Sequence, residues 1–222
     1  MNKTIAIIPA RGGSKRLPNK NLKIFNAVPL VVHSINYAKE NGIQKIIVTT
    51  DDFKTKEIAL KNGVEVIDRP EELATDISPT IDALKHALET LDETFDTVIL
   101  LQPTNPLRPK NLLKEALHKF EEDNYDSLMT VSRNRQKFGK IKNHKFEPFN
   151  YKIGQRSQDL EPLYFENGLL YIIKSSVIKT GKIIGEHHFP FIVEHPFTRV
   201  DIDTKDDFEY AEYLLTKYKN IE

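Results

Sequence analysis

The segment Thr4–Pro9 reads TIAIIP, and the loop that follows it, residues 10–21, reads ARGGSKRLPNKN. Residues 5–8 are all apolar, without the polar alternation of a half-exposed strand, which indicates a strand buried on both faces. Parallel α/β sheets bind ligands beyond the carboxyl ends of their strands. We therefore expect a first buried strand that delivers a glycine-containing basic loop to a binding site.

The rest of the chain alternates short apolar runs with helical patterns. Further strands are predicted at Lys45–Thr50, Val64–Ile67, Thr97–Leu101, Ser127–Ser132 and Leu169–Ile173. Helices are predicted at Pro29–Glu40, from a cap at Asp51 or Asp52 to Lys61, at Pro79–Leu91, from Pro109 to Phe120, and at Thr204–Tyr218. Strands separated by helices predict right-handed βαβ units. The expected fold is a three-layer α/β/α sandwich with a mostly parallel, Rossmann-like sheet.

Residues 133–165 break this alternation. They are polar, with scattered aromatic side chains, and long irregular stretches inside compact domains are usually functional or extend the sheet elsewhere. The 222 residues, 39% of them hydrophobic, are enough for one substantial core. We predict a single domain over residues 1–222, with residues 133–165 as a hairpin-like inserted subdomain.

Composition excludes several classes of function. The 32 basic and 32 acidic residues cancel, so no overall basic field favours nucleic acid or an anionic membrane as a partner. The sequence has no cysteine, which excludes disulfides, thiolate zinc sites and cysteine nucleophiles. We see neither a signal peptide nor an apolar run of the ~20 residues that a membrane span needs. We expect a soluble, cytoplasmic protein.

The basic loop, residues 10–21, has the chemistry of an anion site. Gly12 and Gly13 let the backbone approach a ligand and present N–H groups to it. Four cations fall within ten residues, namely Arg11, Lys15, Arg16 and Lys20. The loop matches neither the Walker pattern nor the dinucleotide G-x-G-x-x-G pattern. A solvated basic loop is the alternative, but the position after a buried strand favours a triphosphate.

Two further segments carry candidate chemistry. The segment 101–108, LQPTNPLR, follows a buried strand, and Gln102 offers a donor and an acceptor that suit a sugar. Arg108 is a candidate partner for a carboxylate or phosphate, and a capping or salt-bridge role is the alternative. Asp201 and Asp203, two residues apart in an expected strand end, would face the same side and suit Mg²⁺. A helix cap is the alternative for Asp203, and solvent exposure is the alternative for Asp201.

These segments resemble the CMP-sialic acid synthetases, the acylneuraminate cytidylyltransferases, whose fold is of the nucleotide-diphospho-sugar transferase type. The resemblance runs through ARGGSKRLPNKN, RPEELA at 69–74, LQPTNPLR, RSQDL at 156–160, the Asn167-Gly168 pair and VDIDT at 200–204. Asn105 stands where the family usually has serine. The resemblance therefore covers most of the chain.

The resemblance implies a role for each matched residue. The nucleotide would contact Ala10, Arg11, Gly12, Gly13, Lys15, Lys20, Asn21, Arg69 and Thr80. The sugar would contact Gln102, Arg108, Arg156, Gln158 and Asn167. Asp201 and Asp203 would hold Mg²⁺ or Mn²⁺ and, with Arg11 and Lys20, would form the catalytic set.

The resemblance also implies an activity, namely transfer of CMP from CTP to a nonulosonic (sialic-type) acid with release of pyrophosphate. It implies a homodimer in which residues 133–165 form the dimerisation element. Two alternatives stay open: transfer to another 2-keto acid sugar such as 3-deoxy-octulosonate, and a catalytically inert nucleotide-binding module. The transfer of CMP requires the basic loop and the acidic pair to meet across one cleft.

Overall fold

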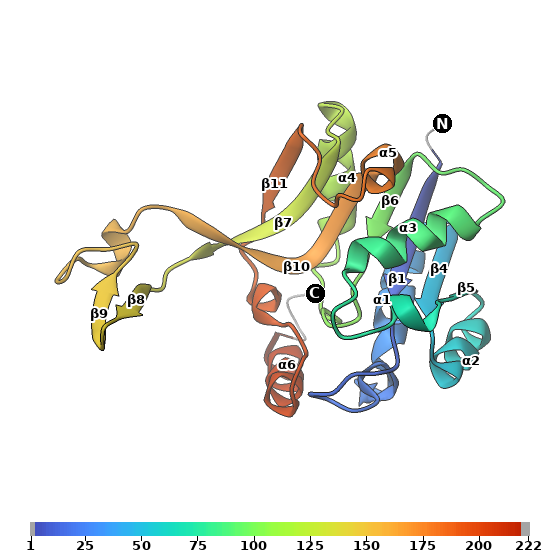
Figure 1. The fold of residues 1–222 in the computed structure, drawn as a ribbon, viewed down its shortest axis with the longest axis horizontal. Helices are drawn as coiled ribbons and strands as arrows, with labels where there is room; N and C mark the ends of the chain where they lie inside the picture. The colour runs from blue at the N-terminus through green and yellow to red at the C-terminus, as the bar shows by residue number, and fades with distance from the viewer. Residues whose placement is uncertain (1–2, 219–222) are drawn as a thin grey trace.

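One seven-stranded sheet organises the molecule, and the computed structural model describes residues 3–218 (Figure 1). The strand order is β11-β7-β10-β6-β1-β4-β5. These strands are β1 (Thr4–Pro9), β4 (Lys45–Thr50), β5 (Glu65–Asp68), β6 (Thr97–Leu100), β7 (Ser127–Asn134), β10 (Leu163–Lys174) and β11 (His188–Ile192). The strands predicted at Thr4–Pro9 and Lys45–Thr50 are confirmed with the same bounds.

The sheet is mostly parallel, as predicted. β1 lies between β4 and β6 and runs parallel to both, with Ile7 opposite Ile47 and Leu100. β10 is the exception, because it runs antiparallel to both β6 and β7. The carboxyl ends of β1, β4 and β6 and the amino-terminal half of β10 therefore lie at the same edge.

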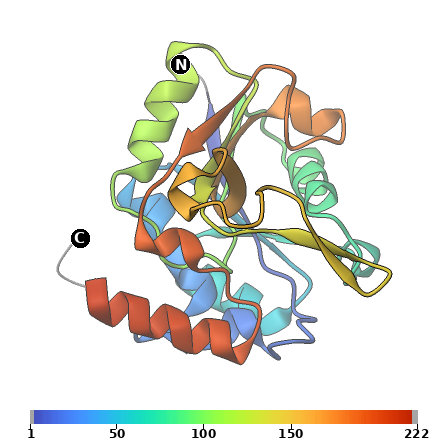
Figure 2. The same cartoon turned by 90° about the vertical axis from the view of Figure 1, so that its left-hand side faces the viewer.

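Helices cover both faces of the sheet and complete the three layers (Figure 2). The α-helices are α1 (Leu30–Glu40), α2 (Phe53–Lys61), α3 (Thr80–Thr90), α4 (Leu112–Glu122), α5 (Ser175–Lys179) and α6 (Lys205–Tyr218). Short 3₁₀ turns lie at η1 (Lys20–Leu22), η2 (Glu71–Leu73), η3 (Ser157–Asp159) and η4 (Pro196–Arg199). Helices α1, α2 and α4 share one hydrophobic cluster, and α3 and α5 share the cluster on the other face.

The alternation within β1 explains the two clusters. Ala6 and Ile8 belong to the α1 side and Ile5 and Ile7 to the α3 side, and all four are 0% exposed. Burying an isoleucine fully contributes about 1.5–3 kcal/mol. Because both faces are covered, the strand is rigid at the point where the basic loop leaves it.

A third cluster fixes α6 and the segment before it. Phe25 and Leu30 pack with Val200, Ile202 and Leu214. A capping box begins α6: Asp207 N donates to Thr204 Oγ1 (3.2 Å), and Thr204 N donates to Asp207 Oδ2 (2.8 Å). This packing brings residues 199–204 against the basic loop.

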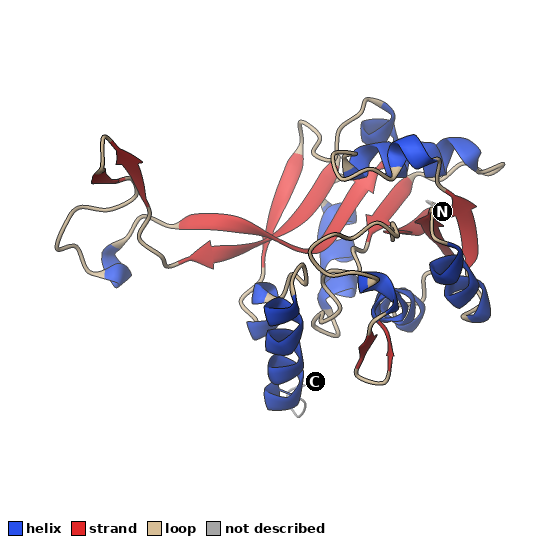
Figure 3. Ribbon diagram, turned by 60° about the horizontal axis from the view of Figure 1, so that its bottom comes forward, coloured by secondary structure: helices blue, strands red, loops and turns tan. Residues whose placement is uncertain are grey.

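A long arm leaves the sheet at the edge where β1, β4 and β6 end (Figure 3). The outer halves of β7 and β10 pair as a two-stranded ribbon, in which Leu163 lies opposite Asn134. At its tip, β8 (Gly139–Lys142) and β9 (Lys145–Pro148) form an antiparallel hairpin. The predicted insertion at residues 133–165 corresponds to this projecting segment.

The register of β10 shifts where the ribbon joins the sheet. From the Glu166–Val131 pair to the Tyr171–Met129 pair, β10 advances five residues while β7 advances two. We call residues 167–170 the bulge. Such irregularities bend a strand and redirect its side chains.

Some boundaries differ from prediction. The helix expected from Pro109 begins at Leu112, after a turn in which Leu112 N donates to Pro109 O (3.1 Å). β11, α5 and the small hairpin of β2 (Ile24–Phe25) and β3 (Val28–Pro29) were not predicted. Within residues 3–218 we find no helix with the length and apolarity to cross a membrane.

Candidate active site

Two adjoining cavities lie at the edge of the sheet where β1, β4 and β6 end. The first, the loop cavity, has a volume of about 150 Å³ and lies beyond the ends of β1 and β6. Six residues predicted to bind nucleotide or sugar line it: Arg11, Lys20, Asn21, Arg69, Thr80 and Gln102. The sheet therefore gathers residues from positions 11 to 102 around one small space.

The second, the bulge cavity, has a volume of about 470 Å³, within the usual range for small-molecule sites. Its wall includes Gln102, Asn167, Tyr171, Arg199 and Asp201. Gln102 and Thr104 line both cavities. A ligand pair that spans the two would therefore meet beside the loop after β6.

The basic loop and the acidic pair meet at Asp203. Lys20 Nζ donates to Asp203 Oδ1 at 2.8 Å and Arg16 Nη2 donates to Oδ2 at 2.5 Å. The Lys20 side chain is only 13% exposed, so this ion pair is largely shielded from solvent. Residues 183 positions apart in sequence thus form one charged centre.

The structure corrects one feature of the acidic pair. Asp201 and Asp203 lie in the loop between η4 and α6, and not at a strand end. Asp201 is exposed, yet partial desolvation by neighbouring protein atoms raises the pKa of its carboxyl. A hydrogen bond from Thr104 lowers this pKa, and the Asp203 carboxylate raises it. Asp201 lines the bulge cavity, while Asp203 contacts the basic loop.

Asp76 binds two cations of the basic loop. Arg11 Nη1 lies 2.8 Å from Asp76 Oδ1, and Lys15 Nζ lies 2.5 Å from Oδ2. The ion-pair hydrogen bonds from Lys15 and then Arg11 lower the pKa of Asp76.

Lys15 and Gly13, both predicted to contact the nucleotide, are exposed and do not line the loop cavity.

Backbone contacts hold the loop against the sheet. Ala10 N donates to Thr49 O (3.0 Å), and Gly12 N donates to Asp51 Oδ1 (2.9 Å). A Cβ on Gly12 would lie 2.8 Å from Asp52 Cβ, so a larger residue would displace the turn. Ala10 and Gly12 therefore set the position of the loop.

The remaining predicted nucleotide contacts are buried or partly buried. Asn21 Nδ2 donates to Arg11 O (2.8 Å), and Arg69 Nη2 donates to Thr49 O (2.7 Å). Burial lowers the pKa of Arg69 to about 10, so the side chain stays charged at neutral pH. Thr80 is the first residue of α3 and is partly exposed at the cavity.

Arg108 does not line either cavity. It is 4% exposed, and its guanidinium donates to Leu169 O (2.7 Å), Gln102 O (2.8 Å) and Ser34 Oγ (3.3 Å). Burial lowers its pKa to about 10. These contacts are structural, but they are neither the helix cap nor the salt bridge of the alternative: they fix the backbone carbonyls of Gln102 and Leu169.

Asn167 lines the bulge cavity, but its side chain also maintains the bulge. Its Oδ1 accepts from Thr130 Oγ1 (2.6 Å), and its Nδ2 donates to Ser132 Oγ (3.0 Å). Asn105, in place of the family's serine, donates to Val200 O (2.6 Å) and Asn167 O (3.2 Å). Asn105 therefore bonds the loop after β6 both to the bulge and to the segment that precedes Asp201.

Arg156 and Gln158 lie in the arm, and neither lines the two cavities. Arg156 Nε donates to Asp159 Oδ2 at 2.7 Å, and both Arg156 and Gln158 are exposed. The chain by itself does not bring them to the other predicted sugar contacts. Their role stays a prediction.

Several residues of the bulge cavity were missed by sequence reasoning. Tyr171 donates to Glu166 Oε1, and burial, followed by this hydrogen bond, raises the pKa of Tyr171. Thr104, between two prolines of the LQPTNPLR segment, bonds Asp201. Arg199 precedes the acidic pair by two residues. Thr104 and Arg199 could have been found from their proximity to recognised motifs.

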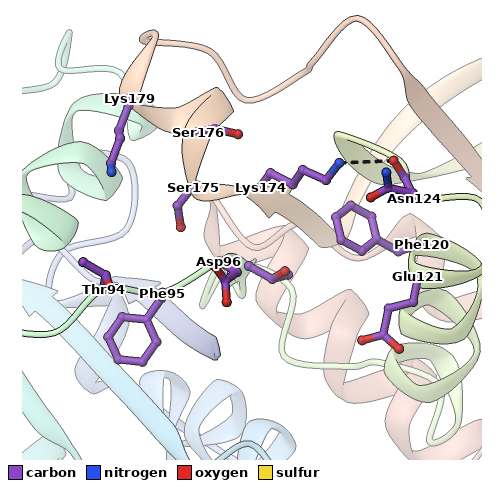
Figure 4. A pocket seen from close by; sticks show the side chains of 11 residues that line it. Thr94, Phe95, Asp96, Phe120, Glu121, Asn124, Lys174, Ser175, Ser176 and Lys179 are labelled. Atoms are coloured by element: carbon purple, nitrogen blue, oxygen red, sulfur yellow. Dashed lines mark hydrogen bonds between the residues drawn. The ribbon is translucent and has the colours of Figure 1, made fainter. Parts of the chain in front are cut away.

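A larger hollow, of about 930 Å³, lies at the other end of the sheet, where β6 begins and β10 ends (Figure 4). It contains none of the predicted site residues. Lys174 crosses it to bond Asn124 O (3.2 Å). In the described part of the chain we find no group of three or more His, Cys, Asp or Glu side chains that would enclose a metal.

The α/β/α sandwich, with a basic loop after its first strand and carboxylates across the cleft, defines the chain as a nucleotidyltransferase-type protein. The chain belongs to the Cytidylyltransferase family, whose sequence profile matches residues 5–221.

Two curated relatives and one solved structure are similar to the chain. An N-acylneuraminate cytidylyltransferase of Streptococcus agalactiae is 34% identical over 93% of this chain and 52% of its own length. A pseudaminic acid cytidylyltransferase of Campylobacter jejuni is 34% identical over 96% of both chains. The chain thus spans about half the length of the first relative. A CMP:2-keto-3-deoxy-manno-octonic acid synthetase complexed with CTP shares the fold, at a TM-score of 0.72, 18% identity and coverage of 97% and 99%.

Proposed function

We propose that this chain transfers CMP from CTP to a nonulosonic acid and releases pyrophosphate. The observation that carries the proposal is the junction of two cavities beside the Lys20–Asp203 ion pair. One cavity is lined by cations for a triphosphate, and the other has the size and polarity for a sugar acid. The names of the two similar cytidylyltransferases support this class of acceptor.

CTP would bind at the loop cavity and extend beyond it, because about 150 Å³ is too small for the whole nucleotide. Arg11 and Lys20 line this cavity, and Lys15 lies on the same basic loop. These cations would neutralise the triphosphate and the departing pyrophosphate, which is the main requirement of such a transfer. Asn21, Arg69 and Thr80 would contact the nucleoside. Ala10 and Gly12, whose N–H groups bond Thr49 and Asp51, would position the loop, and Gly13 would offer its backbone N–H to the phosphates.

The reaction exchanges one phosphorus–oxygen bond for another. The anomeric hydroxyl oxygen of the acid, held near Gln102 in the bulge cavity, forms a bond to the α-phosphorus of CTP. The bond from the α-phosphorus to the bridging β-phosphate oxygen breaks, and pyrophosphate leaves with that electron pair. The hydroxyl proton is released to solvent. No protein nucleophile is needed.

We also propose Mg²⁺ or Mn²⁺ as the cofactor, held by Asp201 and Asp203. The donor set fits, because these ions usually take one or two protein carboxylates and complete their shells with water and phosphate oxygens. When bound, such an ion supplies charge neutralisation at the phosphate oxygens.

The proposal extends to partners. The arm carries strongly exposed apolar side chains, among them Ile141 (79%), Phe149 (66%) and Ile153 (78%). Exposed apolar groups of this kind are typical of interaction surfaces. We infer a homodimer that buries the arm, and we infer no nucleic-acid or membrane partner. The lack of cysteine fits a reducing compartment, and we propose a cytoplasmic location on that basis.

The experiment that tests this function measures pyrophosphate release. The protein is incubated with CTP and Mg²⁺, and with N-acetylneuraminic, legionaminic or pseudaminic acid or 3-deoxy-octulosonate. We expect turnover of at least one nonulosonic acid and none after EDTA treatment. Turnover of octulosonate alone would move the assignment to the other sugar class. CTP binding without turnover of any acid would favour the inert module.

A further inference from the structure

Arg199 is the cation of the bulge cavity. The other charged groups that line this cavity, in the described part of the chain, are the carboxylates of Glu166 and Asp201. Arg199 is exposed, and among residues 3–218 its guanidinium makes no hydrogen bond or ion pair. It is therefore a charge without an internal partner, at the wall of a cavity of about 470 Å³.

The neighbouring cations are engaged elsewhere. Arg108, which the sequence suggested for a carboxylate, donates to Leu169 O and Gln102 O and is buried. Lys20 and Arg16 both bond Asp203. Among these nearby cations, Arg199 alone is free to take an anionic ligand in the bulge cavity.

The geometry points to Arg199 as the residue that binds the carboxylate of the acid substrate, an inference that rests on the proposed function. In a 2-keto acid sugar the carboxylate and the attacking hydroxyl are attached to the same carbon. Whatever binds the carboxylate must therefore lie close to the transfer centre. Arg199 meets this condition, because it is two residues from Asp201 and lines the same cavity.

Charge balance gives an independent reason. Without Arg199, a carboxylate in the bulge cavity would face Glu166 and Asp201 with no basic side chain of this chain in the lining, beside a triphosphate in the next cavity. A guanidinium offers two parallel N–H donors that match a carboxylate. Arg199 would thus both offset this repulsion and orient the acid, so that its hydroxyl faces the loop cavity.

The test compares Arg199→Gln with wild type in the pyrophosphate assay, using the panel acid with the highest rate and the C1 carboxamide of that acid. We expect the KM for the acid to rise about 10- to 100-fold, the usual cost of a lost charged hydrogen bond. The KM for CTP should stay within about twofold. Wild type should prefer the acid over the carboxamide, and Arg199→Gln should lose that preference. Arg199→Lys should restore part of it.

Lys182→Gln is the matched control, because Lys182 is an exposed cation that lines neither cavity. An active wild type with an unchanged KM for the acid in Arg199→Gln would overturn this inference and leave the proposed function intact. The same holds if Arg156→Gln, in the arm, raises that KM while Arg199→Gln does not. A wild type that turns over no acid would overturn both.

Discussion

At the scale of single residues, Asp203 is where the two ends of the chain meet. Its carboxylate accepts from Lys20 and Arg16 of the basic loop, at 2.8 and 2.5 Å. Its backbone N–H also donates to Asp207 Oδ2 (3.1 Å), so the first turn of α6 fixes its position. The same residue is thus available to the loop and, in our proposal, to a metal ion.

Asp203→Asn should lower kcat/KM for pyrophosphate release about 100-fold or more, because the neutral amide can no longer pair with Lys20 or hold a divalent ion. Asp206→Asn is the control, since Asp206 is exposed on the same turn. Circular dichroism should show that both variants are folded. A near-normal rate for Asp203→Asn would remove this residue from the catalytic set.

Arg108 has a structural role, so replacing it should lower the free energy of unfolding. Arg108→Met leaves the buried carbonyls of Leu169 and Gln102 without their donors, which should lower the free energy of unfolding by about 2–5 kcal/mol. Arg135→Met, at an exposed position, should change it by less than about 0.5 kcal/mol. Urea unfolding measures both. Equal stabilities would contradict the structural role.

At the scale of elements, the bulge in β10 builds the sugar-side wall. Gly168 has a φ of 72°, and a Cβ there would lie 2.8 Å from Asn105 Oδ1. The bulge therefore needs both left-handed backbone and an empty space beside Asn105. Only glycine provides both without strain.

Gly168→Ala should lower the free energy of unfolding by about 2–4 kcal/mol, since backbone strain and the clash with Asn105 add. Gly181→Ala is a matched control: its φ is 77°, but nothing lies within 4 Å of the added Cβ. Gly181→Ala should lower the free energy of unfolding only through backbone strain, by about 1–2 kcal/mol. Thermal or urea unfolding would reveal whether the two variants differ; equal losses would show that the contact with Asn105 is unimportant.

Elements with a strong local signal were predictable from sequence. β1 and β4 are apolar runs with clear limits, and Asp52 caps α2 through Thr55 N (2.7 Å) as expected. β11 was missed because its sequence HFPFI contains Pro190, which is tolerated here at the sheet edge but argues against a strand in general. The loop that carries Asp201 and Asp203 was predicted as a strand end because its sequence, VDIDT, alternates apolar and acidic residues as a half-buried strand does.

At the scale of the whole molecule, the motifs located the loop cavity, but they did not specify the bulge cavity. Local patterns suffice for a loop that leaves one buried strand. The bulge wall depends on contacts such as Asn105 to Val200, 95 residues apart, which no local pattern encodes. For the same reason the sequence could not show that the Arg108 guanidinium donates to the carbonyl of Leu169, 61 residues away.

The arm is where assembly should be tested. Replacing Ile141 and Ile153 together by glutamate should convert a dimer to a monomer in sedimentation velocity, because two charges would enter an apolar contact. Phe53→Glu is the control, since Phe53 on α2 is 71% exposed but lies outside the arm. A dimer that survives the double substitution would exclude the arm tip as the contact.

The shift of register in β10 has one more consequence. Across the bulge β10 advances five residues and β7 advances two, a difference of three, which is an odd number. Side chains alternate between the two faces of a strand with a period of two. The bulge therefore puts Glu166 and Tyr171 on the same face of β10, although they are five residues apart. With regular alternation the two side chains would lie on opposite faces, and the Tyr171 hydroxyl could not donate to Glu166 as it does here.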